Sequence, residues 1–233
     1  MKGITERYND SEYLKKNPTW GAEDSPWKAQ HIVSILEKNG LLPETVAEVG
    51  CGAGEIILKL SERYKSSKFV GFELSQNAFD ICKPKKTDRV DFKLQDIAVL
   101  DQQFDLLLCI DVFEHVENYI EFVRDLKPRA KHHIFHIPLD LSVSSVLRGS
   151  MMISREVVGH LHYFTPETAL ATLRDAGYVI EDYFLTAPFA GDGLPSKTFG
   201  AKIMKLPRRA LYALSPSLLS RVFGGCTLLV LTS

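Results

Sequence analysis

The sequence predicts an α/β protein built on a doubly wound, mostly parallel β-sheet. From residue 45 onward, short apolar runs alternate with segments of helical periodicity, which is the pattern of parallel strands joined by crossover helices. A glycine-rich turn joins the first of these strands to the helix after it, and an acidic residue ends the second strand. Because ligands of open sheets bind beyond the carboxyl ends of the strands, both features predict a ligand site there.

The individual elements follow from apolar periodicity and from cap residues. Ser25-Pro26 is expected to supply the cap and first residue of a helix that Asn39-Gly40 ends. Pro207 and Pro216 are each expected to open a short amphipathic helix. The expected strands are residues 45–49, 68–72, 90–94, 104–110, 132–137, 178–185 and 226–232, and the other expected helices lie near 54–64, 75–82, 116–126 and 166–176.

The chain is expected to form one domain with a cytoplasmic location. Its 233 residues, 45% of them apolar, suit a single large core, and four widely spaced cysteines without CxxC spacing favour a reducing compartment. No signal peptide and no run of roughly 18 apolar residues is evident. The expected parts are an N-terminal arm and helix (1–40), a ligand-binding half (41–138) and a substrate-side half (139–233) with insertions at 139–160 and 186–225.

Charge is distributed unevenly along the chain. Asp192 is the last acidic residue and six basic residues follow it, so the first 192 residues carry 22 basic and 29 acidic side chains, a net charge of −7. This acidic body, with no stripe of interleaved basic and aromatic residues, argues against nucleic acid as a partner. The basic segment 197–223 has two interpretations, a solvated helical face or a weak contact surface for an acidic membrane or partner.

The segment VAEVGCGAGE, residues 46–55, predicts a loop that binds a nucleoside. A strand, a glycine-rich turn and a helix in direct succession aim backbone N–H groups at a ligand. Gly50 and Gly52 permit close approaches that a Cβ would prevent, and Gly54 lets the helix pack tightly on the strand. Glu73, 19 residues after Gly54, is placed to accept hydrogen bonds from ribose hydroxyls.

The spacing of the turn argues against a dinucleotide. A dinucleotide fingerprint has the pattern GxGxxG, whereas this turn reads GxGxG, and Glu55 stands where the third glycine would be. A carboxylate there does not suit a pyrophosphate. A nicotinamide-dependent oxidoreductase is therefore the weaker alternative.

Four segments in order, VAEVGCGAGE, FVGFELS, LQDI and FDLLLCIDVFEHVEN, resemble the successive motifs of class I S-adenosylmethionine-dependent methyltransferases. The resemblance is strong over residues 45–127 and extends through HYFTPETALATLRDAGY to about residue 180, in the manner of small-molecule methyltransferases. It implies a Rossmann-like, seven-stranded sheet with an antiparallel last strand. It also implies S-adenosylmethionine as the cofactor and S-adenosylhomocysteine as the product.

The resemblance further implies a role for each motif. The glycine-rich turn and the end of the fourth strand would surround the methionine part of the cofactor, Glu73 would hold the ribose, and Leu74 would pack on the adenine. Many relatives have a small or neutral residue in place of Asp111, which is expected either to hold the cofactor's ammonium group or to face the substrate. The expected cofactor-binding residues are Glu48, Gly50, Cys51, Gly52, Gly54, Glu73, Leu74, Asp96, Ile97, Cys109, Ile110 and Asp111.

Methyl transfer from a sulfonium requires alignment and, for a hydroxyl acceptor, a base, but it requires no metal. Histidine suits the base because its ordinary pKa lies near neutrality. His162, just before the helix capped by Thr165, and His136, at the carboxyl end of the fifth strand, are the candidates, with Asp111 as a further catalytic group. His115 is expected to have a structural role at a helix start.

The expected function is methyl transfer to a small-molecule acceptor, as an O-methyltransferase acting on a carbohydrate-like, phenolic or lipid-linked metabolite. Besides the oxidoreductase, the alternative is a non-catalytic cofactor-binding module that acts through the basic C-terminal helices. Tyr8 and Trp20 in the polar arm have two interpretations, a lid over the site or simple packing.

Overall fold

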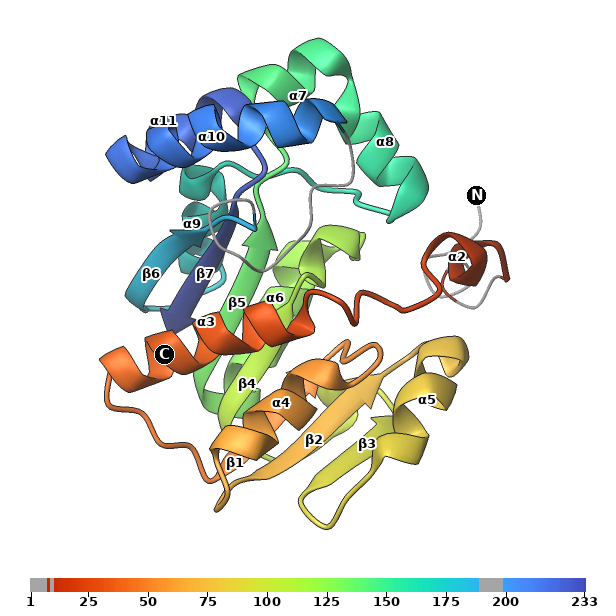
Figure 1. The fold of residues 1–233 in the computed structure, drawn as a ribbon. Coiled ribbons are helices and arrows are strands. Elements are labelled where there is room, and N and C mark those ends of the chain that lie inside the picture. Colours follow the sequence, from red (N-terminus) through yellow and green to blue (C-terminus); the bar gives the residue numbers. More distant parts are fainter. Residues whose placement is uncertain (1–7, 9–10, 189–198) are drawn as a thin grey trace.

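A seven-stranded sheet with helices on both faces forms the centre of the protein (Figure 1). The computed structural model describes residues 8, 11–188 and 199–233, and its strand order is β3-β2-β1-β4-β5-β7-β6, with β7 antiparallel to both neighbours. This order confirms the predicted fold class and the antiparallel last strand. The strands are β1 (Thr45–Val49), β2 (Lys68–Glu73), β3 (Val90–Leu94), β4 (Phe104–Ile110), β5 (Ala130–Pro138), β6 (Ile180–Thr186) and β7 (Thr227–Thr232).

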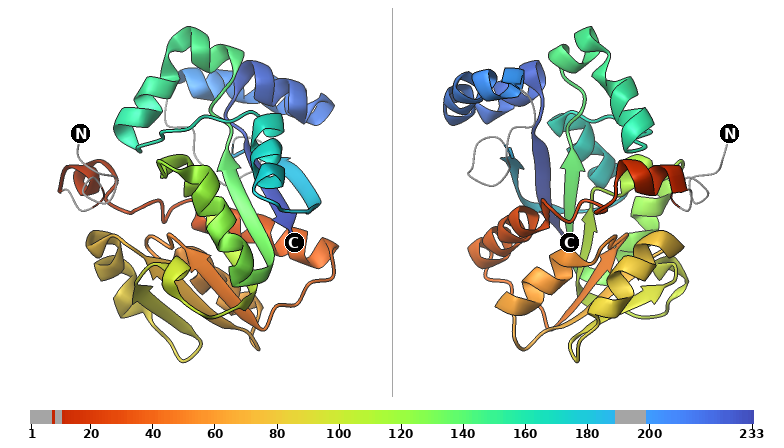
Figure 2. Two further views of the ribbon diagram at one scale, coloured as in Figure 1. Left: turned by 180° about the vertical axis from the view of Figure 1, so that it is seen from behind. Right: turned by 45° about the vertical axis from the view of Figure 1, so that its right-hand side comes forward.

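The helices form two layers and a cap (Figures 1 and 2). One face of the sheet carries α3 (Ser25–Lys38), α4 (Glu55–Arg63) and α5 (Gln76–Cys82), and the other carries α6 (Tyr119–Leu126) and α9 (Pro166–Asp175). Each layer buries its apolar stripe against the sheet, which gives the protein two apolar cores. The short helix α2 (Ser11–Lys16) belongs to the N-terminal arm, and the cap beyond the carboxyl end of β5 contains α7 (Val143–Arg148), α8 (Ser150–Val157), α10 (Phe199–Leu214) and α11 (Pro216–Phe223).

Two of the predicted helix starts are correct and two are wrong. Thr165 caps α9 by accepting a hydrogen bond from the Thr168 amide, and Ser215 caps α11 in front of Pro216. By contrast, α3 begins at Ser25 with Asp24 as its cap residue. Pro207 lies inside α10 instead of opening it. That helix continues because contacts beyond the proline hold it, including a hydrogen bond of 2.5 Å from the Tyr212 hydroxyl to the Leu185 carbonyl.

Asp105 fastens the start of β1 to β4. One of its carboxylate oxygens accepts from the Thr45 amide at 2.9 Å and from the Glu44 amide at 3.1 Å, and the other meets Lys131 Nζ at 2.8 Å. The Lys131 ammonium, together with the bonds from Thr45, lowers the pKa of Asp105 from 3.8 to about 2. The carboxylate therefore stabilises the folded state only while it is ionised.

Replacing Asp105 with asparagine is expected to lower the free energy of unfolding at pH 7 by about 1 kcal/mol, a value discounted for solvent exposure. Because the pKa is depressed in the folded protein, this stabilisation is present above about pH 4 and is lost as the pH falls towards 2. Urea unfolding of both proteins at several pH values measures the difference. A difference in the free energy of unfolding that stays constant down to about pH 2 would contradict this role of the Asp105 carboxylate.

Candidate active site

A cavity of about 770 Å³ lies beyond the carboxyl ends of β1, β2 and β4, where the sequence predicts the ligand site. The glycine-rich turn forms one wall, and residues of the N-terminal arm and the start of α3 form the opposite wall. The predicted cofactor residues that line the cavity are Glu48, Gly50, Cys51, Gly52, Glu73, Leu74, Asp96, Ile97, Ile110 and Asp111.

Glu73 organises the glycine-rich turn from the end of β2. One of its oxygens accepts from the Gly52 amide at 2.9 Å, and the other accepts from the Leu74 and Ser75 amides, both at 2.8 Å. Burial raises the pKa of Glu73, whereas these backbone hydrogen bonds oppose that shift. Gly50 and Gly52 have φ values of +63° and +52°, so both use the left-handed region that favours glycine.

The cavity wall also offers an apolar surface and a further carboxylate. Leu74 is 54% exposed beside the cavity, an unusual state for a leucine next to a buried strand end. Asp96 accepts a hydrogen bond from the Ala98 amide at 2.8 Å and thereby caps a short turn, Ile97–Val99. Asp96 therefore combines a capping role with a place in the cavity wall.

Two predicted residues lie off the cavity wall. Cys109 is fully buried in the core between β4 and α6, because alternate residues of a strand point to opposite faces. Gly54 packs against Phe92 of β3 and Cys82 of α5 behind the turn. Neither is among the described residues that line the cavity.

Asp111 is the centre of a charged network at the end of β4. Its carboxylate lies 2.7 Å from Lys28 Nζ and 2.6 Å from His136 Nδ1, and its backbone has a φ of +54°, rare for a residue other than glycine. Burial raises the pKa of Asp111, but the Lys28 charge and the bonds from Lys28 and His136 outweigh burial and hold that pKa well below its ordinary value. Lys28 stays charged because Asp111 and Asp24 raise its pKa more than burial lowers it.

The two favoured histidines have structural partners. His136 is 1% exposed, and its second ring nitrogen lies 2.8 Å from the Thr227 hydroxyl. His162 Nε2 donates to the Val116 carbonyl at 2.9 Å. Among the residues that the structure describes, neither lines the cavity, so the geometry gives no support to the prediction that one of them is the base.

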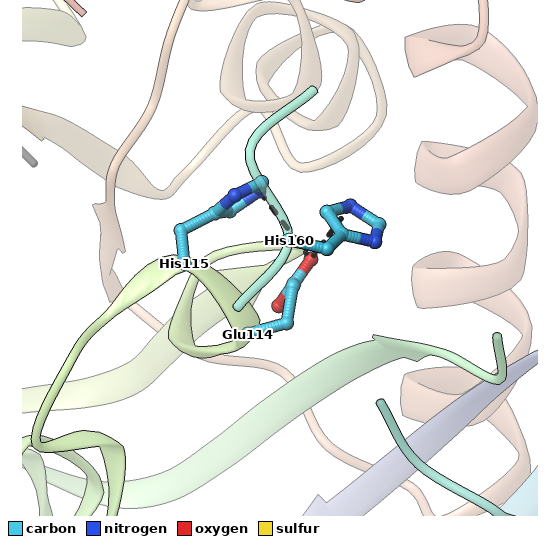
Figure 3. A group of neighbouring side chains, drawn as sticks. All are labelled: Glu114, His115 and His160. Carbon is cyan, nitrogen blue, oxygen red and sulfur yellow. Dashed lines mark ion pairs between the residues drawn. The ribbon is translucent and has the colours of Figure 1, made fainter. Parts of the chain in front are cut away.

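Three other side chains meet at the edge of the cavity, namely Glu114, His115 and His160 (Figure 3). Glu114 and His115 project from the turn Phe113–His115, and His160 comes from the segment after α8. His115 and His160 line the cavity, whereas Glu114 has no solvent exposure. Burial raises the pKa of Glu114 well above its ordinary value, and the neighbouring Asp111 charge adds to the shift.

Residues of the N-terminal arm line part of the cavity. Trp20, with a φ of +51°, packs against Gly52 so closely that a Cβ there would lie 2.7 Å from the indole ring. Tyr8 and Asn17 hydrogen-bond the carbonyl groups of Val158 and Val157 at 3.4 and 3.2 Å. The arm therefore contacts both the glycine-rich turn and the end of α8, and its action as a lid stays a prediction.

Sequence reasoning gave no role to Lys28 or Glu114 and preferred His162 to His160. Glu114 and His115 belong to the motif FDLLLCIDVFEHVEN, so the sequence did contain a signal for them, an acidic residue beside a histidine just after the fourth strand. For Lys28 the only signal is Asp24 four residues earlier, with which it forms an ion pair at 2.9 Å.

Part of the basic C-terminal segment has structural partners. Arg208 donates to the Gly224 carbonyl at 2.7 Å, and Arg221 pairs with Glu167. Within the described residues, no helix is long and apolar enough to cross a membrane. Lys197 and the side chains of Lys202 and Lys205 lie outside the described residues.

Comparison with known proteins identifies the family. A family model described as a methyltransferase domain matches residues 23–183. Ubiquinone biosynthesis O-methyltransferases are similar as well. The one from Idiomarina loihiensis is 27% identical over 188 residues, which cover 70% of this chain and 75% of that protein. The one from Rickettsia bellii is 27% identical over 140 residues, which cover 53% of this chain but only 58% of that protein.

Solved structures share the fold along almost the whole chain. Magnesium protoporphyrin IX methyltransferase from Synechocystis PCC 6803, with bound S-adenosylhomocysteine, has a TM-score of 0.65 at 16% identity and covers 98% of this chain and 96% of its own. The plantazolicin methyltransferase BpumL, also with S-adenosylhomocysteine, has a TM-score of 0.64 at 16% identity, with 98% and 93% covered. The chain therefore belongs to the methyltransferase-domain family. Within it, the order of motifs and strands is that of the class I S-adenosylmethionine-dependent methyltransferases.

Proposed function

We propose that this protein transfers the methyl group of S-adenosylmethionine to a hydroxyl oxygen of a small molecule. The observation that carries the proposal is that one cavity is lined both by the glycine-rich turn with Glu73 and by His115 with His160. We take the part beside the turn and Glu73 as the cofactor end and the part beside the two histidines as the acceptor end. Similarity to ubiquinone biosynthesis O-methyltransferases favours a phenolic or lipid-linked acceptor.

The cofactor is proposed to lie along the turn with its ribose at Glu73. The carboxylate retains about one acceptor site beyond the three amide bonds, on the oxygen that accepts from Gly52, so it can also accept from a ribose hydroxyl. Leu74 would lose its exposed apolar surface under the adenine, and Asp96 would accept from the exocyclic amine. The Lys28 ammonium beside Asp111 would meet the methionine end, where the cofactor carries a carboxylate and an ammonium.

In the reaction, an electron pair of the acceptor oxygen forms the new O–CH₃ bond while the S–CH₃ bond breaks and its electrons neutralise the sulfonium. The hydroxyl proton is released to solvent, and S-adenosylhomocysteine remains. This chain contributes alignment and a cavity that the arm partly covers, which favours a direct displacement. His115 and His160 are the histidines that line the cavity among the described residues, and this supports the proposal that the acceptor hydroxyl lies next to them.

Calorimetric titration of the protein with S-adenosylhomocysteine and with NAD tests the cofactor. We expect saturable binding of S-adenosylhomocysteine and none of NAD, because Glu55 occupies the place of the third dinucleotide glycine. Transfer of label from methyl-labelled cofactor to a panel of phenols, sugars and lipid-linked hydroxyl compounds then tests the acceptor. Binding of NAD alone would refute the proposal, and label found only in amines would refute its choice of acceptor atom.

A further inference from the structure

Glu114 is a buried carboxyl group without a conventional partner. Its side chain is 0% exposed, and neither of its oxygens has a hydrogen-bond partner in another described residue. Burial of an unpaired carboxylate costs several kcal/mol, and buried polar groups almost always bind protein, water or an ion. An occupant next to Glu114 is therefore required for this carboxylate to be stable in ionised form.

Two imidazole nitrogens face the same carboxylate oxygen. His115 Nε2 lies 3.6 Å from Glu114 Oε1, and His160 Nε2 lies 4.0 Å from it. The ligand atoms of the three residues all lie within 4.8 Å of one another, and Figure 3 shows the side chains converging from two separate segments. These N···O separations are too long for hydrogen bonds. In a tetrahedral metal site with ligands about 2.1 Å from the ion, neighbouring ligand atoms lie about 3.4 Å apart, which is close to the separations found here.

Asp140 orients one of these imidazoles. His160 Nδ1 donates to Asp140 Oδ2 at 2.5 Å, which leaves the lone pair of Nε2 directed at Glu114. A histidine that binds a metal typically donates its other ring N–H to a carboxylate in this way, because the carboxylate fixes the tautomer and the ring orientation.

We propose that Glu114, His115 and His160 bind one divalent transition-metal ion at the acceptor end of the cavity. Two imidazoles and one carboxylate suit Zn²⁺, Co²⁺ or Fe²⁺, whereas Mg²⁺ and Ca²⁺ prefer oxygen ligands alone. Three protein ligands leave at least one coordination position for an oxygen from the cavity. The sequence motifs alone predict no metal.

This inference rests on the proposed function, because it gives the ion a task in that reaction. A hydroxyl bound to such an ion loses its proton more readily, so the acceptor would react as an alkoxide or phenoxide with its proton released to solvent. In this arrangement His160 is a ligand, and Asp140 is a positioning residue.

Metal binding is measured directly on the full chain after chelator treatment. Titration with Co²⁺ is expected to give a visible d–d absorption that saturates at one ion per chain, and Zn²⁺ is expected to displace it. Glu114→Gln and His160→Ala should each weaken Co²⁺ binding by at least about 100-fold, and Asp140→Asn by about 10- to 100-fold. Thermal unfolding of the metal-free variants shows whether they fold, and the nearly isosteric Glu114→Gln is the more conservative of the two.

His132 supplies a matched control. Its Nδ1 lies 3.4 Å from Glu181 Oε1, so His132 also stands beside a carboxylate, but this pair lies outside the cavity lining. His132→Ala should leave the Co²⁺ spectrum and affinity unchanged. Absence of stoichiometric binding by the unmodified chain, or equal binding by Glu114→Gln, overturns the metal site. S-adenosylhomocysteine affinity is measured on the same samples. If the unmodified chain binds S-adenosylhomocysteine but no metal, this inference alone is refuted. If the unmodified chain binds no S-adenosylhomocysteine, the proposed function is refuted.

Discussion

Replacing Glu73 with alanine is expected to weaken S-adenosylhomocysteine binding by about 1 to 3 kcal/mol, or roughly 5- to 150-fold. The substitution removes the proposed ribose acceptor and also frees the amides of Gly52, Leu74 and Ser75, which the carboxylate now holds at 2.8 to 2.9 Å. The turn would therefore lose part of its preorganised shape as well as a direct contact. Isothermal titration calorimetry measures the change.

Glu62 provides the control for this experiment, because it is an exposed acid on α4 that pairs with Lys59 Nζ at 2.9 Å. Glu62→Ala removes the same charge without touching the turn and should leave the affinity within about twofold, the range expected of a surface substitution. Equal affinities for the Glu73→Ala variant and the unmodified protein would refute the role of Glu73 in cofactor binding.

Replacing Gly54 with alanine is expected to destabilise the protein by about 2 to 5 kcal/mol and to lower its Tm by about 5 to 15 °C. Gly54 has a φ of +77°, and a Cβ there would lie 2.4 Å from Phe92 Cε1 and 3.1 Å from Cys82 Cβ. Both contacts belong to the packed layer between α4, α5 and β3, so the clash has little room to relax. Differential scanning calorimetry measures the shift.

Gly40→Ala separates backbone strain from packing. Gly40 has a similar φ of +66°, but no heavy atom lies within 4 Å of a Cβ built there. Only the strain of about 1 to 2 kcal/mol should remain, with a correspondingly smaller fall in Tm. Equal losses at Gly40 and Gly54 would contradict the packing argument.

Most helices and strands could be predicted from the sequence because the signals for them lie in neighbouring residues. Strands such as Phe104–Ile110 are uninterrupted apolar runs, and Thr165 with Pro166 gives a helix start its cap and first residue, so both were predicted to the residue. The start of α3 and the course of α10 were not: α3 begins one residue earlier, with Asp24 as its cap residue, and α10 continues through Pro207 to Tyr212, whose hydroxyl donates to the Leu185 carbonyl. Propensity describes only nearby residues, and tertiary packing overrides it.

The candidate active site also has one part that the sequence predicts and one part that it does not. The cofactor end is continuous in the sequence, since the glycine-rich turn and Glu73 belong to two adjacent strands with a recognisable spacing. The proposed acceptor end is assembled from separate segments, because Glu114 and His160 meet only when the turn after β4 and the segment after α8 come together. No spacing rule connects such residues.

The sequence by itself determined the α/β fold, the methyltransferase family and the position of the glycine-rich turn, because periodicity, turn chemistry and motif order are properties of contiguous residues. Tertiary structure alone decided which histidines reach the cavity. In strand β5 the pleat and the neighbouring Thr227 enclose His136, and a backbone carbonyl engages His162, while the chain after α8 brings His160 to Glu114. Burial and orientation depend on what packs around a residue, and the order of residues along the chain does not contain that information.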